Sequence, residues 1–428
     1  MVPRHSRDRA MTDTPIRFLF RHKDYLRYFI GMVPIQFGTQ IEAITIPWQV
    51  YHIARETRSI EESAFMVGMV GLCQFLPLFV LTLYAGTLAD RVSRRAIVLW
   101  ALLAEGLGVL ALAALALQGA PSLTAIFLIA ALFGAARAFL SPAANSLVPM
   151  LVSRTDMPQA ISLSTTVWMM ATIGGPFLGA LLISHSIATA YLVAALTYVA
   201  GVVALLTIRT NTTPERQEGS ALALVREGLS YVWQNRVVFG AISLDLFAVL
   251  LGGVTALLPA FATDILQVGP TGNAVLRMAP AVGGLIISVW LSYRPIRRAA
   301  GLKMFLGVAA FGLATIVFAY SQSLWLSFAA LVVLGAGDMI SVNVRQTLIQ
   351  IVTPDHMRGR VSAVSGLFIS GSNELGEFES GVLSRFVGPV TAAAIGGYGT
   401  LAVTGIWAWA FPDLRKADRL DGKDSGHV

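Results

Sequence analysis

Residues 75–112 read FLPLFVLTLYAGTLADRVSRRAIVLWALLAEGLGVLAL. Two apolar runs are separated here by a short loop, residues 90–95, that carries one aspartate and three arginines. A bilayer core about 30 Å thick requires about 20 apolar residues for one helical crossing, and both runs, extended to 63–89 and 96–117, are long enough. Because a backbone in lipid must satisfy its own hydrogen bonds, the stretch predicts two membrane-spanning helices.

Apolar runs of similar length recur along the whole chain. They are too long and too uniformly apolar for the strands of a membrane barrel. The sequence therefore predicts an all-α integral membrane protein with twelve transmembrane helices, at 27–52, 63–89, 96–117, 123–149, 158–184, 187–208, 237–262, 272–293, 301–320, 324–350, 361–384 and 388–411.

The composition agrees with a chain that is largely surrounded by lipid. Of 428 residues, 55% are hydrophobic and 13% are charged, whereas a soluble domain carries about 25% charged residues. Most of the 31 Lys and Arg residues fall in the two tails and in every second loop. This alternation places both termini in the cytoplasm by the positive-inside rule, so the net charge of +7 indicates membrane topology and no nucleic-acid partner.

The sequence offers little for enzymatic or metal chemistry. Cys73 is the single cysteine, which excludes a disulfide framework and a CxxC metal site. The six histidines form no ligand cluster, and no GxxxxGK[ST] phosphate-binding motif occurs. We therefore expect no enzyme activity, no cofactor and no metal.

The predicted helices fall into two groups of six. We expect a cytoplasmic N-terminal tail (1–26), an N-terminal six-helix bundle (27–208), a cytoplasmic linker (209–236), a C-terminal six-helix bundle (237–411) and a cytoplasmic C-terminal tail (412–428). The linker segment ALALVREGLSYVWQNR reads as an amphipathic helix on the membrane surface.

A weak internal repeat relates the two bundles. With an offset of 201 residues, FGAARAFLSPAANSL from Phe133 lies over LGAGDMISVNVRQTL from Leu334, and TIGGPFLGALL from Thr172 lies over NELGEFESGVL from Asn373. Two pseudo-symmetric halves are typical of secondary transporters, which hold their substrate between the halves near the membrane midplane.

The loop after the second predicted helix carries a known motif. GTLADRVSRR, residues 86–95, resembles the major facilitator superfamily loop motif G-x-x-x-D-R-x-G-R-[KR], and Ser93 departs from it. The resemblance implies the major facilitator fold and a cytoplasmic gate in which the carboxylate of Asp90 meets a helix N-terminus. The alternative is that the arginines only set topology. The motif residues are Gly86, Asp90, Arg91, Arg94 and Arg95.

Two further stretches resemble transporters of this superfamily. TIGGPFLG in the fifth helix resembles part of the antiporter motif through Gly174, Gly175, Pro176 and Gly179, which implies close packing and a bend. The segment 344–381, above all NELGEFESG, and DLFAVLLGG from Asp245 resemble the bacterial enterobactin (siderophore) exporters. This similarity implies export of an iron-free siderophore, which nothing in composition or spacing shows.

Acidic residues in the eleventh helix are candidates for function, because an ionisable group at bilayer depth costs about 2.5–3.5 kcal/mol. Glu374 and Glu377 share one helix face, and two close carboxylates resist double ionisation. They are therefore proton or substrate candidates, with a structural pair as the alternative. Glu379 projects differently, and its function stays open. Asn373 is a candidate for lining the cavity.

The first helix is polar along its middle. Gln36 and Gln40 are candidates for lining a central cavity, and Glu42 for binding protons or substrate. A buried hydrogen-bond network is the alternative for these residues.

Charges in other helices suggest further roles. Arg137 and Asp338 occupy matched places in the repeat and are candidates for proton coupling, either paired with each other or each with a separate partner. Asp245 is either a gate residue or a polar helix end, and Glu105 reads as a structural partner of another polar group. Arg345 is expected to snorkel to the cytoplasmic side.

The sequence-based hypothesis is a multi-pass exporter of the bacterial inner membrane, with both termini cytoplasmic. It moves a siderophore to the periplasm by alternating access and proton antiport. The expected partners are a small-molecule substrate, protons and the bilayer, with outer-membrane efflux components as a further possibility, and the protein is expected to be a monomer. A multidrug or macrolide-type efflux transporter and a non-transporting membrane receptor remain as alternatives.

Overall fold

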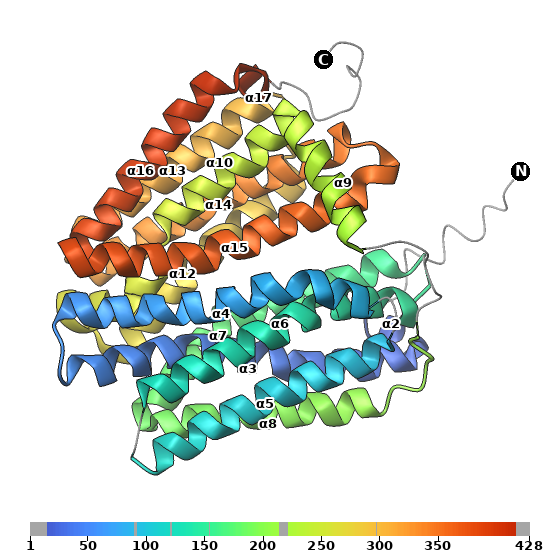
Figure 1. The fold of residues 1–428 in the computed structure, drawn as a ribbon, viewed down its shortest axis with the longest axis horizontal. Coiled ribbons are helices and arrows are strands. Elements are labelled where there is room, and N and C mark those ends of the chain that lie inside the picture. The colour runs from blue at the N-terminus through green and yellow to red at the C-terminus, as the bar shows by residue number, and fades with distance from the viewer. Residues whose placement is uncertain are drawn as a thin grey trace, which may run out of the picture. The chain divides into compact units, whose positions relative to one another are not determined.

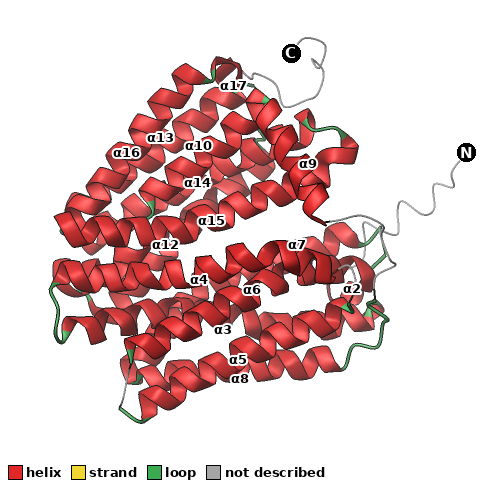
Figure 2. Cartoon of the chain, viewed as in Figure 1, coloured by secondary structure: helices red, strands yellow, loops and turns green. Residues whose placement is uncertain are grey.

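A computed structural model describes residues 15–89, 92–119, 122–153, 155–213, 221–296 and 298–416. Every regular element within these ranges is a helix, and most connections between the helices are short (Figures 1 and 2). Asp90 and Arg91 of the predicted gating motif lie outside the described residues. The all-α prediction is confirmed.

The described residues up to 213 form seven helices. They are α2 (Pro15–Arg21), α3 (Lys23–Arg55), α4 (Ile60–Ala89), α5 (Arg94–Leu117), α6 (Leu123–Leu151), α7 (Met157–His185) and α8 (Ile187–Leu206). Polar residues in the loops start the later helices: the hydroxyl of Ser122 accepts from the backbone N–H of Ala125, and that of Ser186 accepts from Thr189 at 3.0 Å. Such N-caps satisfy N–H groups that have no partner inside the helix.

The second part contains more, and shorter, elements. They are α9 (Ala221–Gln234), α10 (Arg236–Gly252), η1 (Thr255–Leu257), α11 (Leu258–Ala260), η2 (Phe261–Ile265), α12 (Gly269–Tyr293), α13 (Ala300–Tyr320), α14 (Leu324–Val352), α15 (Asp355–Val387), α16 (Pro389–Ala410) and α17 (Pro412–Lys416). Helix α9 is the predicted linker helix.

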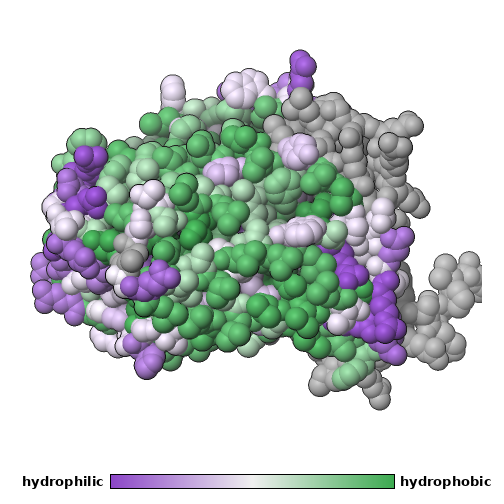
Figure 3. Space-filling view, turned by 60° about the horizontal axis from the view of Figure 1, so that its bottom comes forward, coloured by the Kyte–Doolittle hydropathy of each residue, from purple (hydrophilic) through white to green (hydrophobic). Residues whose placement is uncertain are grey.

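Eleven segments of the described chain are long and apolar enough to cross a membrane. The remaining predicted span, the eleventh at 361–384, forms a helix as expected, within α15. Its polar and acidic residues make α15 too hydrophilic to qualify by composition. Hydrophobic residues cover most of the middle of the face shown in Figure 3, and hydrophilic residues gather mainly at its left and right edges, as expected for a protein embedded in lipid.

The seventh predicted span is interrupted, which the hydropathy pattern did not indicate. Helix α10 ends at Gly252, and the chain continues through η1, α11 and the π-helical η2. A helix broken at membrane depth needs new partners for its backbone groups. The hydroxyl of Ser380 donates to the carbonyl of Gly253 at 2.5 Å, and that of Thr400 to Ala248 at 3.2 Å.

The contacts divide the chain into two compact units. The first comprises residues up to 45 and 76–218, and the second comprises 46–75 and 219 onward. This division passes through α3 and α4 and therefore differs from a simple cut at the linker. Within the first unit α5 packs between α6 and α8, and within the second α14 packs on α12 and α13, and α10 on α15 and α16 (Figure 1).

Inside the second unit, the first half of α4 meets α15 through glycine. A Cβ atom built on Gly68 would lie 2.8 Å from the Cα of Gly381 and 2.9 Å from the carbonyl oxygen of Glu377. Real Cβ atoms do not approach so closely, so the two backbones are in direct contact. Small residues commonly permit such contacts between membrane helices.

Candidate functional site

A buried polar cluster links four helices of the first unit. Arg137 on α6 donates to the carboxylate of Glu42 on α3 at 3.1 Å, and the hydroxyl of Tyr198 on α8 donates to the other oxygen of Glu42 at 2.9 Å. Glu105 on α5 approaches the same guanidinium, with Oε1 3.9 Å from Nε of Arg137. Two carboxylates therefore share one arginine.

The cluster is buried, and burial raises the free-energy cost of an unbalanced charge. The side chains of Glu42 and Glu105 are 1% and 3% exposed, while that of Arg137 is 27% exposed. If both acids are ionised, the cluster carries one negative charge more than its arginine neutralises, and burial opposes such an excess. The arrangement can therefore hold one proton. The two carboxylates that contact Arg137 here, Glu42 and Glu105, belong to the same unit as Arg137.

A cavity of about 550 Å³ lies in the first unit. Its size falls within the usual range of small-molecule sites, about 300–1,000 Å³. None of the described residues that line it is charged, and the polar and aromatic ones include Tyr28, Gln36, Asn145, Ser164, Thr165 and Trp168. Gln36 thus lies on a cavity wall. Gln40 is placed differently, since its amide donates to the hydroxyl of Thr172 on α7 at 3.5 Å.

The glycines of the predicted antiporter-like motif pack against α3. A Cβ atom on Gly174 would lie 3.4 Å from the ring of Phe37, one on Gly175 would overlap Gln40, and one on Gly179 would lie 2.5 Å from Ile44. Pro176 lies buried in the same turn of α7. Close packing of α7 on the polar helix α3 therefore depends on this motif.

The acidic residues of α15 lie in the second unit. Glu377 packs against Gly71 of α4, since its Oε2 atom would be 3.6 Å from a Cβ atom built there. Glu374, Glu377 and Glu379 are all partly buried, and Asn373 is exposed. Oε2 of Glu379 is buried and has no hydrogen-bond partner among the described residues.

Arg345 corrects a prediction. It does not snorkel to an aqueous boundary, because its side chain is 2% exposed and forms an ion pair with Asp245 of α10, itself 7% exposed. Asp338, two turns earlier on α14, is close enough to interact electrostatically with both groups. Asp245 is thus a buried member of a charged cluster, and it is not a polar helix end.

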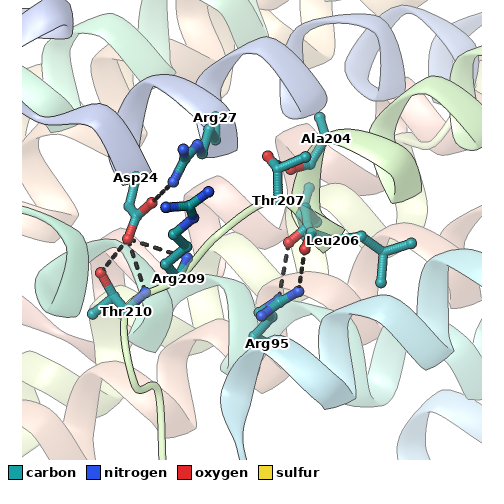
Figure 4. Close-up of polar contacts among 9 residues, drawn as sticks. Asp24, Arg27, Arg95, Ala204, Leu206, Thr207, Arg209 and Thr210 are labelled. Carbon is teal, nitrogen blue, oxygen red and sulfur yellow. Dashed lines mark hydrogen bonds and ion pairs between the residues drawn. The ribbon is translucent and has the colours of Figure 1, made fainter.

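Two arginines of the loop motif join helix ends within the first unit. Arg95 donates to the carbonyl oxygens of Leu205 at 2.9 Å and Leu206 at 2.5 Å (Figure 4). Both carbonyls lie at the C-terminal end of α8. Arg94 donates to the carbonyl of Ser146 at 3.4 Å. Arginine near a helix C-terminus is favourable because unpaired carbonyls gather there. Gly86 lies in α4.

Asp24 holds the start of the linker in the same region. Its carboxylate accepts from the backbone N–H groups of Arg209 at 3.2 Å and Thr210 at 2.8 Å, and from the side chain of Arg27 (Figure 4).

Asp156 in the loop before α7 is held in a similar way. Burial tends to raise its pKa, but hydrogen bonds from Ser153, Arg21 and His22 outweigh it and hold the pKa of this carboxyl below its usual value. The contact from Ser153 is 2.8 Å and that from His22 is 2.9 Å. This part of the unit therefore depends on an ionised carboxylate.

The sequence as a whole decides what kind of protein carries these features. The profile of the transmembrane secretion effectors matches residues 20–428. The chain belongs to the transmembrane secretion effector family. It is therefore a multi-pass transporter of the major facilitator superfamily, and it is not an enzyme.

Individual relatives of this secretion effector support the same conclusion. It is 26% identical to the enterobactin exporter of Salmonella typhi over 400 residues, and 24% identical to that of Escherichia coli O1:K1 over 401 residues, covering 92% of each chain in both cases. Among solved structures, a bacterial homologue of the iron transporter ferroportin matches with a TM-score of 0.69 and 18% identity, covering 92% of this chain and 98% of the other. A POT family transporter gives a TM-score of 0.69 at 12% identity, covering 92% and 96%. At these identities the structures show the shared fold.

One polar cluster in the second unit of this secretion effector was not predicted from the sequence. Arg55, near the end of α3, donates to both oxygens of Asp264 in η2, at 3.1 and 3.3 Å, and the hydroxyl of Tyr51 donates to the same carboxylate. The π-helical geometry of η2, which is frequent at functional sites, gives no signal in hydropathy. No group of His, Cys, Asp and Glu suited to a metal occurs in the described ranges.

Proposed function

We propose that the protein exports a siderophore, an enterobactin-like catecholate, from the cytoplasm across the bacterial inner membrane in exchange for protons. The observation that carries this proposal is the similarity to enterobactin exporters over 92% of both chains. In this proposal both termini are cytoplasmic, the protein works as a monomer, and two six-helix halves open a central site to either side in turn.

The cluster of Glu42, Glu105 and Arg137 supports proton coupling. Acids inside a membrane protein are costly, and this pair can lose its excess charge by binding one proton. A proton that moves down a potential of 100 mV supplies about 2.3 kcal/mol. At about 1.4 kcal/mol per decade, one proton could sustain a substrate gradient of about fortyfold.

The cavity supports a substrate that is amphiphilic and carries aromatic groups. Trp168 and Tyr28 offer ring surfaces, while the amide of Asn145 and neighbouring hydroxyls offer hydrogen bonds. Glu374 and Glu377 remain candidates for substrate or proton binding from the second unit, and the loop motif with Asp90 remains a candidate for the cytoplasmic gate.

A second candidate is a multidrug or macrolide-type exporter of the same fold. The lining of the cavity favours this candidate, because Met32 and Met157 contribute flexible, polarizable surface. Such a surface adapts to varied ligands.

Transport by the purified chain in proteoliposomes tests both candidates. Enterobactin should accumulate inside when an acidic interior is imposed, and collapse of the pH gradient with nigericin should abolish accumulation. Liposomes without protein control for passive entry. Accumulation of a macrolide in place of enterobactin would select the second candidate, and the absence of any pH-driven accumulation would refute proton antiport.

A further inference from the structure

The two carboxylates that share Arg137 are not equivalent. Glu42 has a donor for each oxygen, Arg137 at 3.1 Å and Tyr198 at 2.9 Å. Glu105 only approaches Nε of Arg137, at 3.9 Å, and its Oε1 atom has no hydrogen-bond partner in the described part of the chain. Both side chains are almost completely buried.

This difference determines where a proton is needed. Charge-assisted hydrogen bonds stabilise an ionised carboxylate. Glu42 has a donor on each oxygen, whereas the only described hydroxyl within reach of Glu105 is that of Tyr198, which donates to Glu42. A buried carboxylate oxygen without a donor bears the cost of its desolvation, as Oε1 of Glu105 does among the described residues. One guanidinium neutralises one acid, so the second acid is stable in the site only as a neutral carboxyl.

We infer that Glu105 is the group that takes up and releases the coupled proton, and that Arg137 is its positioning residue. This inference rests on the proposed proton antiport and assigns the proton to one acid. It also replaces the expectation that Glu105 is only a structural partner.

Three neighbouring helices contribute groups that can respond to the charge of Glu105. Helix α3 contributes Glu42, α6 contributes Arg137, and α8 contributes Tyr198, whose single O–H proton can be donated to only one of the two acids at a time. When Glu105 releases its proton, it competes with Glu42 for the guanidinium and for this hydroxyl. The helices α3 and α5 then compete for one arginine on α6.

The competition reaches the cavity through two helices. Helix α3 carries Gln36 on the cavity wall and Glu42 in the cluster. Helix α6 carries Arg137 in the cluster and, one turn later, Ser141 on the wall. A shift of Arg137 from Glu42 toward Glu105 thus moves the side of the cavity that these helices form. Loss of the proton and a change of the cavity wall are parts of one rearrangement.

Proton release on substrate binding tests the assignment. The full chain in detergent is mixed with enterobactin in weak buffer, and released protons are followed with a pH indicator dye. The wild type should release about one proton per protein, and Glu105→Gln should release none. The exposed Glu62→Gln is a matched control, and it should behave as the wild type.

Exchange of labelled for unlabelled enterobactin separates coupling from structure. Glu105→Gln should retain exchange, but the exchange should no longer depend on pH. Glu105→Asp should again release a proton, and its exchange should depend on pH with a shifted profile. A slower exchange in both variants with an unchanged pH profile would show a structural role and overturn the assignment. Undiminished proton release by Glu105→Gln would also overturn it, without affecting proton antiport.

A failure of the underlying proposal would look different. If the wild type releases no proton and its accumulation of enterobactin ignores an imposed pH gradient, then proton antiport itself is refuted, and the role of Glu105 with it.

Discussion

Replacing Arg345 by methionine tests the buried ion pair on α14. Methionine keeps much of the length of the side chain and removes its charge. The change would leave Asp245 without a partner at 7% exposure, with Asp338 nearby. Breaking a buried pair by removing one partner costs about 3–5 kcal/mol, whereas a snorkelling arginine in contact with water would contribute about 1 kcal/mol or less. The two interpretations therefore differ by a measurable amount.

Equilibrium unfolding in mixed micelles of dodecyl maltoside and SDS, followed by circular dichroism, gives the free energy of unfolding. Arg345→Met should lower it by about 3–5 kcal/mol. A second change, Asp245→Leu, should recover much of this loss, because the unpaired charge is then gone. A loss below about 1 kcal/mol in the single variant would refute the reasoning, and so would a double variant that loses the sum of the two single changes.

Three further predictions follow from local contacts. Gly68→Val should lower the thermal midpoint and transport, because its Cβ would lie 2.8 Å from the Cα of Gly381 in α15. Gly405→Val is the control and should change neither, since no described atom lies within 4 Å of a Cβ built there. Equal effects of the two substitutions would contradict the contact. Asp264→Asn should cost only about 1 kcal/mol by thermal unfolding, because the side chain of Arg55 is 33% exposed, and a loss of several kcal/mol would argue otherwise. Asp156, whose pKa is lowered, should stabilise the wild type relative to Asp156→Asn at neutral pH. This difference should vanish as the pH falls below about 4, and a difference that grows on acidification would contradict the assignment.

Hydropathy was sufficient to predict the helices because the cost of exposing a polar backbone to lipid acts along the whole segment. The predicted spans 96–117 and 187–208 differ from α5 and α8 by only a few residues. The interruption after Gly252 was missed because hydropathy reports only how apolar a segment is, and the broken segment is as apolar as an unbroken helix. Its backbone partners, the hydroxyls of Ser380 and Thr400, lie far away in sequence and leave the apolar pattern intact.

The site was less predictable than the fold. Glu42 and Arg137 were candidates because an ionisable group in lipid has a high free-energy cost. The sequence could not predict that these two residues form an ion pair with each other. Arg345 was misjudged because Asp245 lies about a hundred residues earlier and only the fold brings the two together. The sequence suggested only a structural role for Glu105, since it cannot show that Arg137 and Tyr198 donate to the two oxygens of Glu42.

The glycine contact between α4 and α15 affects how these helices can move. Helices that meet through interlocking side chains must lift over one another to change register, and the contact of Gly175 with Gln40 on α3 is of that kind. Where Gly68 meets Gly381, two smooth backbones touch. Displacement by one residue, about 1.5 Å along a helix axis, would encounter no side-chain ridge at that point. Sliding at this crossing would therefore be resisted by the side chain of Glu377 against Gly71, one turn along α4, and not by the glycine pair itself.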